Sequence, residues 1–286
     1  MNYFLIALFL LSLSSYAQRP NTFITQLDKK VKETSGLIRL NGRLITHNDS
    51  GGKPALYEVN PENGKVTRVV RVTNATHVDW EDICHDGEFI YIGDFGNNAG
   101  ARKNLVIYKV PVREFLEQEE VQAEKIRFQY AEQTDFRRTR MQTNFDAESL
   151  IARGDSLYLF TKNWGNQQTS LYAIPKIPGN HTVKSKGNLA VNALLTGAHY
   201  NEATGSVWLT AYTALFRSFL VEIKDAFGGS LSTRQFERHN IKPDQASTQI
   251  EAIAPTGEAG TYYISSEDQG GFKPALQRVD VTRLIR

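Results

Sequence analysis

Asp49-Ser50-Gly51-Gly52-Lys53-Pro54-Ala55-Leu56 decides the fold, because Asp268-Gln269-Gly270-Gly271-Phe272-Lys273-Pro274-Ala275-Leu276 nearly copies it close to the other end of the chain. Residues 94–97 and 163–166 keep the same order: an Asp or Asn, a variable residue, a Gly and an Asn. One turn therefore recurs at four places in the chain. A turn that recurs in this way indicates an architecture built from internal repeats.

Each turn lies between two short apolar runs, and a third run lies upstream of them, as expected for consecutive β-strands. A fifth unit has the runs without the turn, at Val207–Leu209 and Leu220–Ile223. The units are about 50 residues long, with one longer interval that holds an insertion, and this length is typical of propeller blades. The sequence therefore predicts an all-β fold, a five-bladed β-propeller.

The outermost strand of each blade can also be assigned. It is predicted at 65–72, 125–130, 188–191 and 233–240 in units one to four, whereas unit five ends without one. The apolar run at 22–27 precedes unit one and has no partner there. We expect this N-terminal strand to close the last blade, because closure removes a free sheet edge that would invite aggregation.

The composition and the N-terminus bound the remaining possibilities. Residues 1–17 have the apolar core and small-residue end of a secretory signal peptide, with cleavage after Ala17, and the run is too short to cross a bilayer. We therefore expect a secreted or periplasmic protein with a single domain at 18–286. The net charge is only +2, which predicts no nucleic-acid partner, and Cys84 is alone, which excludes an internal disulfide. A monomer is expected.

The aligned first strands carry the candidate metal ligands. If these strands line a central channel, one position in each blade forms a ring of oxygen-bearing side chains: Ser35, Glu81, Glu148, Thr196 and Glu251. Glu33, Asp79 and Asp146 lie two residues before Ser35, Glu81 and Glu148. Converging carboxylates repel one another, and Ca²⁺, a hard cation that prefers oxygen ligands, would neutralise them. The alternative is that these side chains accept hydrogen bonds from the backbone of neighbouring blades.

Residues 33–44, continuing to Asp49 and Tyr57, resemble the first blade of the calcium-activated nucleotidases, or apyrases, which are five-bladed propellers with a central Ca²⁺. The ring order Ser, Glu, Glu, hydroxyl, Glu also resembles theirs, and the resemblance implies that the five ring residues bind the metal. A second resemblance, to phytase-like esterase domains, rests on residues 148–152 and 251–254. The chain departs from the nucleotidases before the first blade, where only Asp28 stands for their acidic segment.

The recurring turn supplies the candidate catalytic residues. Asp or Asn two residues before Gly is ordinary turn chemistry, so the turn itself explains most of these polar side chains. His47, Lys162 and Glu267 are not required by the turn, and with Asp49 they would offer a base, a phosphate-binding cation and acids at the channel mouth. The insertion after the second blade adds a short helix near 112–120 and the arginine run 136–140, either a phosphate clamp or a solvated loop.

Two functions follow from these observations. The first is a calcium-dependent hydrolase of a phosphoester, a phosphoanhydride or another ester, acting on a small molecule at the channel mouth. The second is a non-catalytic propeller that binds a glycan, a peptide or a partner protein and uses Ca²⁺ for rigidity. The sequence does not choose between them.

Overall fold

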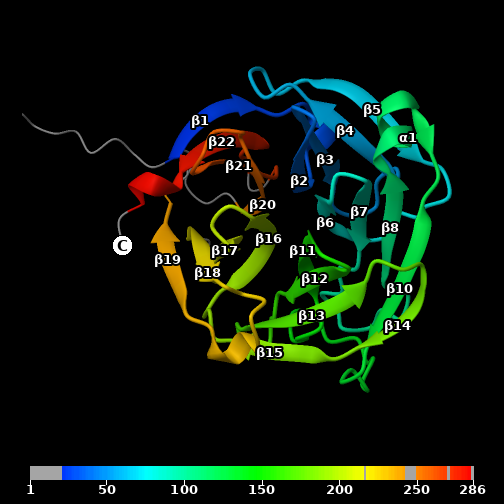
Figure 1. Cartoon of the computed structure of the whole chain (residues 1–286), viewed down its shortest axis with the longest axis vertical. Helices are drawn as coiled ribbons and strands as arrows, with labels where there is room; N and C mark the ends of the chain where they lie inside the picture. Colours follow the sequence, from blue (N-terminus) through cyan, green and yellow to red (C-terminus); the bar gives the residue numbers. More distant parts are fainter. Residues whose placement is uncertain (1–20, 216, 242–248, 269–270, 285–286) are drawn as a thin grey trace, which may run out of the picture.

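Five antiparallel sheets form a ring in the computed structural model, which describes residues 21–215, 217–241, 249–268 and 271–284 (Figure 1). Each sheet is one blade, and its first strand lies innermost. The innermost strands are β2 (Thr34–Leu40), β6 (Trp80–His85), β11 (Ala147–Arg153), β16 (Leu194–Asn201) and β20 (Ile250–Pro255). Each of them contacts the innermost strand of both neighbouring blades. The prediction of a five-bladed β-propeller is therefore confirmed.

The other strands continue each blade outwards. The second strands are β3 (Arg43–Asn48), β7 (Phe89–Asp94), β12 (Ser156–Thr161), β17 (Ser206–Tyr212) and β21 (Thr261–Ser266). The third strands are β4 (Ala55–Val59), β8 (Val106–Pro111), β13 (Thr169–Pro175), β18 (Ser218–Lys224) and β22 (Ala275–Asp280). The fourth strands of blades one to four are β5 (Val66–Val72), β10 (Glu124–Tyr130), β15 (Ser185–Leu189) and β19 (Phe236–Asn240). The fourth strands agree with the predicted segments, except that β15 begins earlier and β19 later than expected.

The N-terminal strand β1 (Asn21–Gln26) supplies the fourth strand of blade five. It pairs antiparallel with β22, with Thr22 opposite Arg278 and Gln26 opposite Ala275. Figure 1 shows β1 and β22, which come from opposite ends of the sequence, side by side on the ring. The predicted closure of the ring is confirmed. The predicted signal peptide at 1–17 lies outside the described residues.

Two further strands cover the outer edges of blades one and two. β9 (Glu120–Val121) adds to β5 in parallel, and β14 (Gly179–Val183) adds to β10 in parallel. A short helix, α1 (Val112–Glu117), lies where the sequence predicted one. Single turns of 3₁₀-helix complete the described elements: η1 (Lys29–Val31), η2 (Leu231–Thr233) and η3 (Val281–Arg283). Within the described ranges, no helix has the length and apolarity needed to span a membrane.

The hydrophobic core is divided among the interfaces between adjacent blades. Ile45 and Trp80 belong to a cluster shared by blades one and two, and Phe160 and Leu209 to one shared by blades three and four. Comparable clusters join the remaining neighbours, including blades five and one. Burial of these apolar side chains holds each blade against the next, so the ring must be closed for every cluster to have both of its sides.

We expect removal of residues 21–27 to destabilise the whole ring, because the β22 edge loses its partner and the cluster between blades five and one loses Leu27. Thermal melting and size-exclusion chromatography would test this, with a chain that begins at Asn21 as the control. The shorter chain should melt at a lower temperature or aggregate. Identical melting of the two chains would show that β1 does not stabilise the ring.

Candidate functional site

A β-bulge places one side chain of each innermost strand out of the regular alternation. The pairing of the first two strands skips one residue in blades two to five: Glu81, Glu148, Thr196 and Glu251. All four side chains are buried. A β-bulge changes the direction of a side chain, and bulges are frequent next to active sites. Four of the five predicted ring residues therefore occupy one equivalent position.

Blade one differs from the others at this position. The skipped residue is Gly36, and Ser35 instead pairs with His47 across the strands. A Cβ at Gly36 would lie only 2.6 Å from Nε2 of His47. The His47 ring therefore occupies the space into which a fifth side chain would project.

His47 is a packing residue in this arrangement. Its ring is buried and stands edge-on to Trp80, with 5.6 Å between the ring centres, and its Nδ1 donates a hydrogen bond to the Asn48 carbonyl at 2.9 Å. Burial is the largest of the effects that lower its pKa to about 3, so the ring is neutral. The structure thus places His47 between blades one and two, against Trp80 and Gly36.

The two hydroxyl groups of the predicted ring connect neighbouring blades. Ser35 donates its hydroxyl hydrogen to the backbone carbonyl of Glu81, and Thr196 donates to the carbonyl of Ile250 at 2.6 Å. These bonds join the innermost strands of blades one and two and of blades four and five. Both hydroxyl oxygens keep lone pairs, but their hydrogens are committed to structural bonds.

Carboxylates gather where the innermost strands begin. Oxygen atoms of Asp49, Asp79 and Glu81 lie within 4.8 Å of one another, and so do those of Glu81, Asp146 and Glu148. Glu81 belongs to both groups and joins them into one acidic cluster. A Cβ at Gly96 would lie 1.9 Å from Oε1 of Glu81, so the glycine of the recurring turn also makes room for this carboxylate.

Lys162 is buried in contact with this cluster. Its Nζ lies 3.0 Å from Oε1 of Glu148, and the side chains of both residues are at most 5% exposed. The ammonium group also lies over the rings of Trp164 and Tyr212. Burial opposes its charge, but Glu148 and other nearby groups raise its pKa well above the usual value. Lys162 is therefore a charged group that offsets part of the negative charge.

Two buried carboxylate oxygens at this end of the channel have no hydrogen-bond partner within the described residues. They are Oδ1 of Asp49 and Oε1 of Glu251. Leaving a buried acceptor without a partner costs about 1–3 kcal/mol, and more if it is charged. A cation between these groups would remove that cost.

The pKa values of the acidic groups reflect the same excess of buried negative charge. Burial first, and then neighbouring carboxylates, raise the pKa of Asp49 and of Glu267 to about 8. The same two causes raise the pKa of Asp79 to about 6, and burial raises that of Glu251 to about 7. Such shifts are frequent at functional sites, although structural ion pairs also produce them.

The acidic cluster and its neighbours Glu267 and Lys162 form an outer and an inner layer. Asp49, Asp79 and Glu267 are half-buried, whereas Glu81, Glu148 and Lys162 are buried. The first three lie at the end of the channel where the recurring turns are, and they are more exposed than the other three. Of the predicted catalytic residues, the structure therefore brings together Asp49, Lys162 and Glu267.

Asp82 is a central residue that the sequence analysis did not select. Its carboxylate accepts hydrogen bonds from the backbone N–H groups of Leu150 (2.8 Å) and Ala198 (3.3 Å), in blades three and four. The residue that follows the bulge is small or apolar in the other blades: Leu37, Ser149, Gly197 and Ala252. An acid at an otherwise apolar inward position was the available signal. Asp82 crosses the channel and joins three of its five strands.

No protein-family model matches the chain, and no curated protein matches its sequence. The predicted resemblance to nucleotidases and phytase-like esterase domains therefore stays a prediction.

Solved structures with similar folds do exist, at low sequence identity. Glutaminyl cyclase from Myxococcus xanthus is 13% identical, with a TM-score of 0.53 over 90% of this chain and 95% of that one. A GH43 β-1,3-galactosidase bound to galactodeoxynojirimycin is 10% identical, with a TM-score of 0.55 over 86% and 89%. CoXyl43, a GH43 β-xylosidase/α-arabinofuranosidase from a compost metagenome, is 10% identical, with a TM-score of 0.50 over 91% and 94%; its structure is a calcium-free form with xylotriose. These likenesses support the propeller fold alone.

We expect the metal-free protein to lose stability as the pH rises from about 4 to about 8. The folded-state pKa values of Asp49, Glu251 and Glu267 lie above those of an unfolded chain, so folding retains protons that unfolding releases. The stability that these bound protons contribute is fully present below about pH 4 and is lost as the pH rises to about 8. Thermal melting in chelator across this range would measure it. A melting temperature that rises across the whole range would contradict the assignment.

Replacing Asp82 by Ala should lower the free energy of unfolding by about 2–4 kcal/mol, because buried N–H groups of two other blades lose their acceptor. Asp82→Asn retains one oxygen acceptor and should cost less. Chemical denaturation of the two variants would compare them. Equal stability of Asp82→Ala and the wild type would show that the bridge does not hold the inner strands.

Proposed function

We propose that the acidic end of the channel binds Ca²⁺ and that the protein is a hydrolase of an ester or phosphoester that enters at this end. The observation that carries the proposal is the convergence of Asp49, Asp79, Glu81, Asp146 and Glu148, with unpartnered oxygens on Asp49 and Glu251. Export, with cleavage of residues 1–17, is part of the proposal, since weak extracellular Ca²⁺ sites work at the concentrations found there.

The chemistry of the available donors fits a hard cation. The acidic cluster offers only oxygen atoms, and its two groups share Glu81, so one ion near Glu81 could reach carboxylates from both. The predicted ring ligands Glu81, Glu148 and Glu251 remain in the proposed ligand set, and Asp79 and Asp146 join it. Ser35 and Thr196 would contribute through the hydroxyl oxygens that also link the blades.

Acid–base chemistry would come from the outer layer. Burial first, and then the neighbouring Asp79 and Glu267, raise the pKa of Asp49, so the charge of an ionised Glu267 favours the protonated form of Asp49. The ionised member can take a proton from an attacking water, and the protonated member can give one to the leaving oxygen. Lys162, in the inner layer, would stabilise the negative charge that develops on the substrate during hydrolysis. A bound Ca²⁺ would polarise the substrate oxygen.

A second candidate is a binding propeller in which the metal only stiffens the ring. The buried contact between Lys162 and Glu148 favours it, because this pair already neutralises part of the inner layer without a metal. The sugar-type ligands bound to the GH43 propellers are a property of those proteins, but they are a reason to include glycans in a screen of this chain.

Calcium binding should raise the melting temperature, because a ligand that binds only the folded state stabilises it by about 2.7 kcal/mol at a hundredfold excess over Kd. Melting in chelator and in millimolar Ca²⁺ would measure the shift. Glu81→Gln should lose most of it, since Glu81 belongs to both carboxylate groups. The control is Glu117→Gln, on the exposed face of α1, which should keep the full response.

Turnover is tested separately from metal binding. The purified chain would be screened against nucleotides, phytate, aryl phosphates, aryl esters and aryl glycosides, with and without Ca²⁺. Glu267→Gln should abolish hydrolysis yet keep the calcium response, because Glu267 lies outside both carboxylate groups. A calcium response without turnover on any substrate would favour the binding propeller. A melt that ignores both chelator and Ca²⁺ would refute the metal site.

A further inference from the structure

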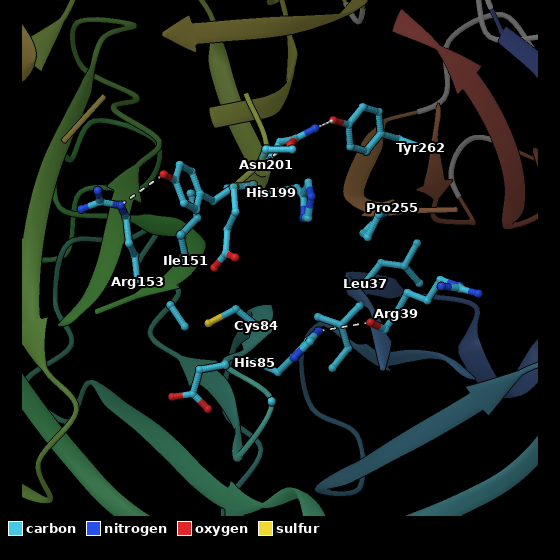
Figure 2. Close-up of a pocket in the computed structure, with 18 of the residues that line it drawn as sticks. Leu37, Arg39, Cys84, His85, Ile151, Arg153, His199, Asn201, Pro255 and Tyr262 are labelled. Carbon is cyan, nitrogen blue, oxygen red and sulfur yellow. Dashed lines mark hydrogen bonds between the residues drawn. The ribbon is translucent and has the colours of Figure 1, made fainter. Parts of the chain in front are cut away.

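A cavity lies at the opposite end of the channel from the acidic cluster. It is formed where the innermost strands end and has a volume of about 910 Å³, within the range of small-molecule sites. All five blades contribute to its lining, as Figure 2 shows with residues from Leu37 in blade one to Pro255 in blade five. The proposed hydrolysis does not involve this cavity.

Asp82 separates this cavity from the acidic cluster. Glu81 belongs to the acidic cluster, whereas Ile83 and Cys84 line the cavity, so Asp82 stands between the two ends. Its carboxylate bridges across the channel to Leu150 and Ala198. A ligand bound in the cavity would therefore not touch the acidic cluster.

Most charges around the cavity already have partners. Asp86 pairs with Lys176 at 2.8 Å, and Glu258 pairs with Arg278 at 2.5 Å. Glu202 is exposed, so water solvates its carboxylate. These groups leave no buried negative charge that would need a ligand.

Arg39 is different, because the residue is half-buried and its positive charge has no ion-pair partner within the described residues. The side chain lines the cavity, and within the described residues no hydrogen bond or ion pair reaches its guanidinium group. A Cβ at Gly257 would lie 2.8 Å from its Nη1, so the guanidinium lies against the backbone of blade five. A half-buried guanidinium without a counter-ion favours an anionic ligand, above all a planar or tetrahedral oxyanion that can accept two hydrogen bonds.

His199 adds an uncharged polar group in the middle of the cavity. Its ring contacts Tyr262 at 5.5 Å between centres, and within the described parts of the chain its nitrogens make no hydrogen bond. Burial and the nearby His85 lower its pKa to about 4, so it stays neutral and offers one donor and one acceptor. Across the cavity, Arg153 donates a hydrogen bond from Nε to the Tyr200 hydroxyl (3.3 Å), and its guanidinium group lies over the rings of Tyr200 and Phe227.

The remaining wall is apolar. Leu37, Ile151 and Pro255 line the cavity, and Figure 2 shows Ile151 on one side of it and Leu37 and Pro255 on the other. Such a wall suits a flat or aliphatic body rather than an ion alone.

We propose that this cavity binds a small organic anion, whose carboxylate or phosphate-type group pairs with Arg39 while its apolar body packs between Leu37, Pro255 and His199. The site is independent of the proposed hydrolysis. Carboxylate and phosphate share the chemistry that Arg39 recognises, and the experiment distinguishes them.

Calorimetric titration of the full chain with 2-naphthoate, 2-naphthylphosphonate and the neutral 2-naphthamide would test the site. At least one anion should bind saturably, with naphthamide about tenfold weaker or undetectable, because a charge-assisted hydrogen bond contributes more than 1.4 kcal/mol. Whichever anion binds tighter identifies the head group. Binding of neither anion at millimolar concentration, or equal binding of naphthamide, would overturn the proposal.

Variants locate the binding. Arg39→Met should weaken the anion about tenfold or more, Arg39→Lys should retain part of the affinity, and Arg113→Met, on the exposed face of α1, should bind like the wild type. Because Arg39 makes no contact that the fold needs, Arg39→Met should melt like the wild type. Glu81→Gln should bind normally. Loss of binding in Glu81→Gln, or unchanged affinity in Arg39→Met, would place the anion elsewhere and refute the site.

Discussion

Closure of the ring by β1 and β22 is the constraint on which the rest of the structure depends. Each hydrophobic cluster is shared by two adjacent blades, so no blade completes its core alone. Once β1 gives the last blade its fourth strand, each blade packs against a neighbour on both sides. The five innermost strands are then held in fixed positions. The geometry at both ends of the channel follows from this closure, since each end is assembled from residues of several blades.

Closure also creates an electrostatic cost. The innermost strands begin at the same end of the channel, and their bulges and turns bring acidic side chains there together. Lys162 offsets part of the charge, and raised pKa values offset more by keeping protons bound. A fold selected only for stability would replace such groups by apolar residues, so their retention is a reason to assign them a task. At the middle of the channel, Asp82 has a different role, because backbone N–H groups satisfy its carboxylate.

The similar propellers are only 10–13% identical to this chain, which shows how little of the fold depends on particular residues. Apolar alternation, turns and small residues at close contacts suffice for a blade. Function depends instead on the few side chains that the blades present to the channel, and these differ freely between proteins of one fold. The two ends of this channel illustrate the point, since one gathers carboxylates and the other leaves Arg39 without a counter-ion.

The blades, their order and the strand that closes the ring could be predicted from the amino-acid sequence, because the recurring turn and the strand alternation are local patterns. The sequence also determined the equivalence of Glu81, Glu148 and Glu251, which occupy the same bulge in their blades. Three features required the folded arrangement: Gly36 rather than Ser35 stands at that bulge in blade one, His47 fills the space beside it, and Asp82 bridges three blades. The reason is physical: a one-residue shift at a bulge changes the direction of a side chain, and contacts between blades join residues whose spacing in the sequence carries no periodic signal.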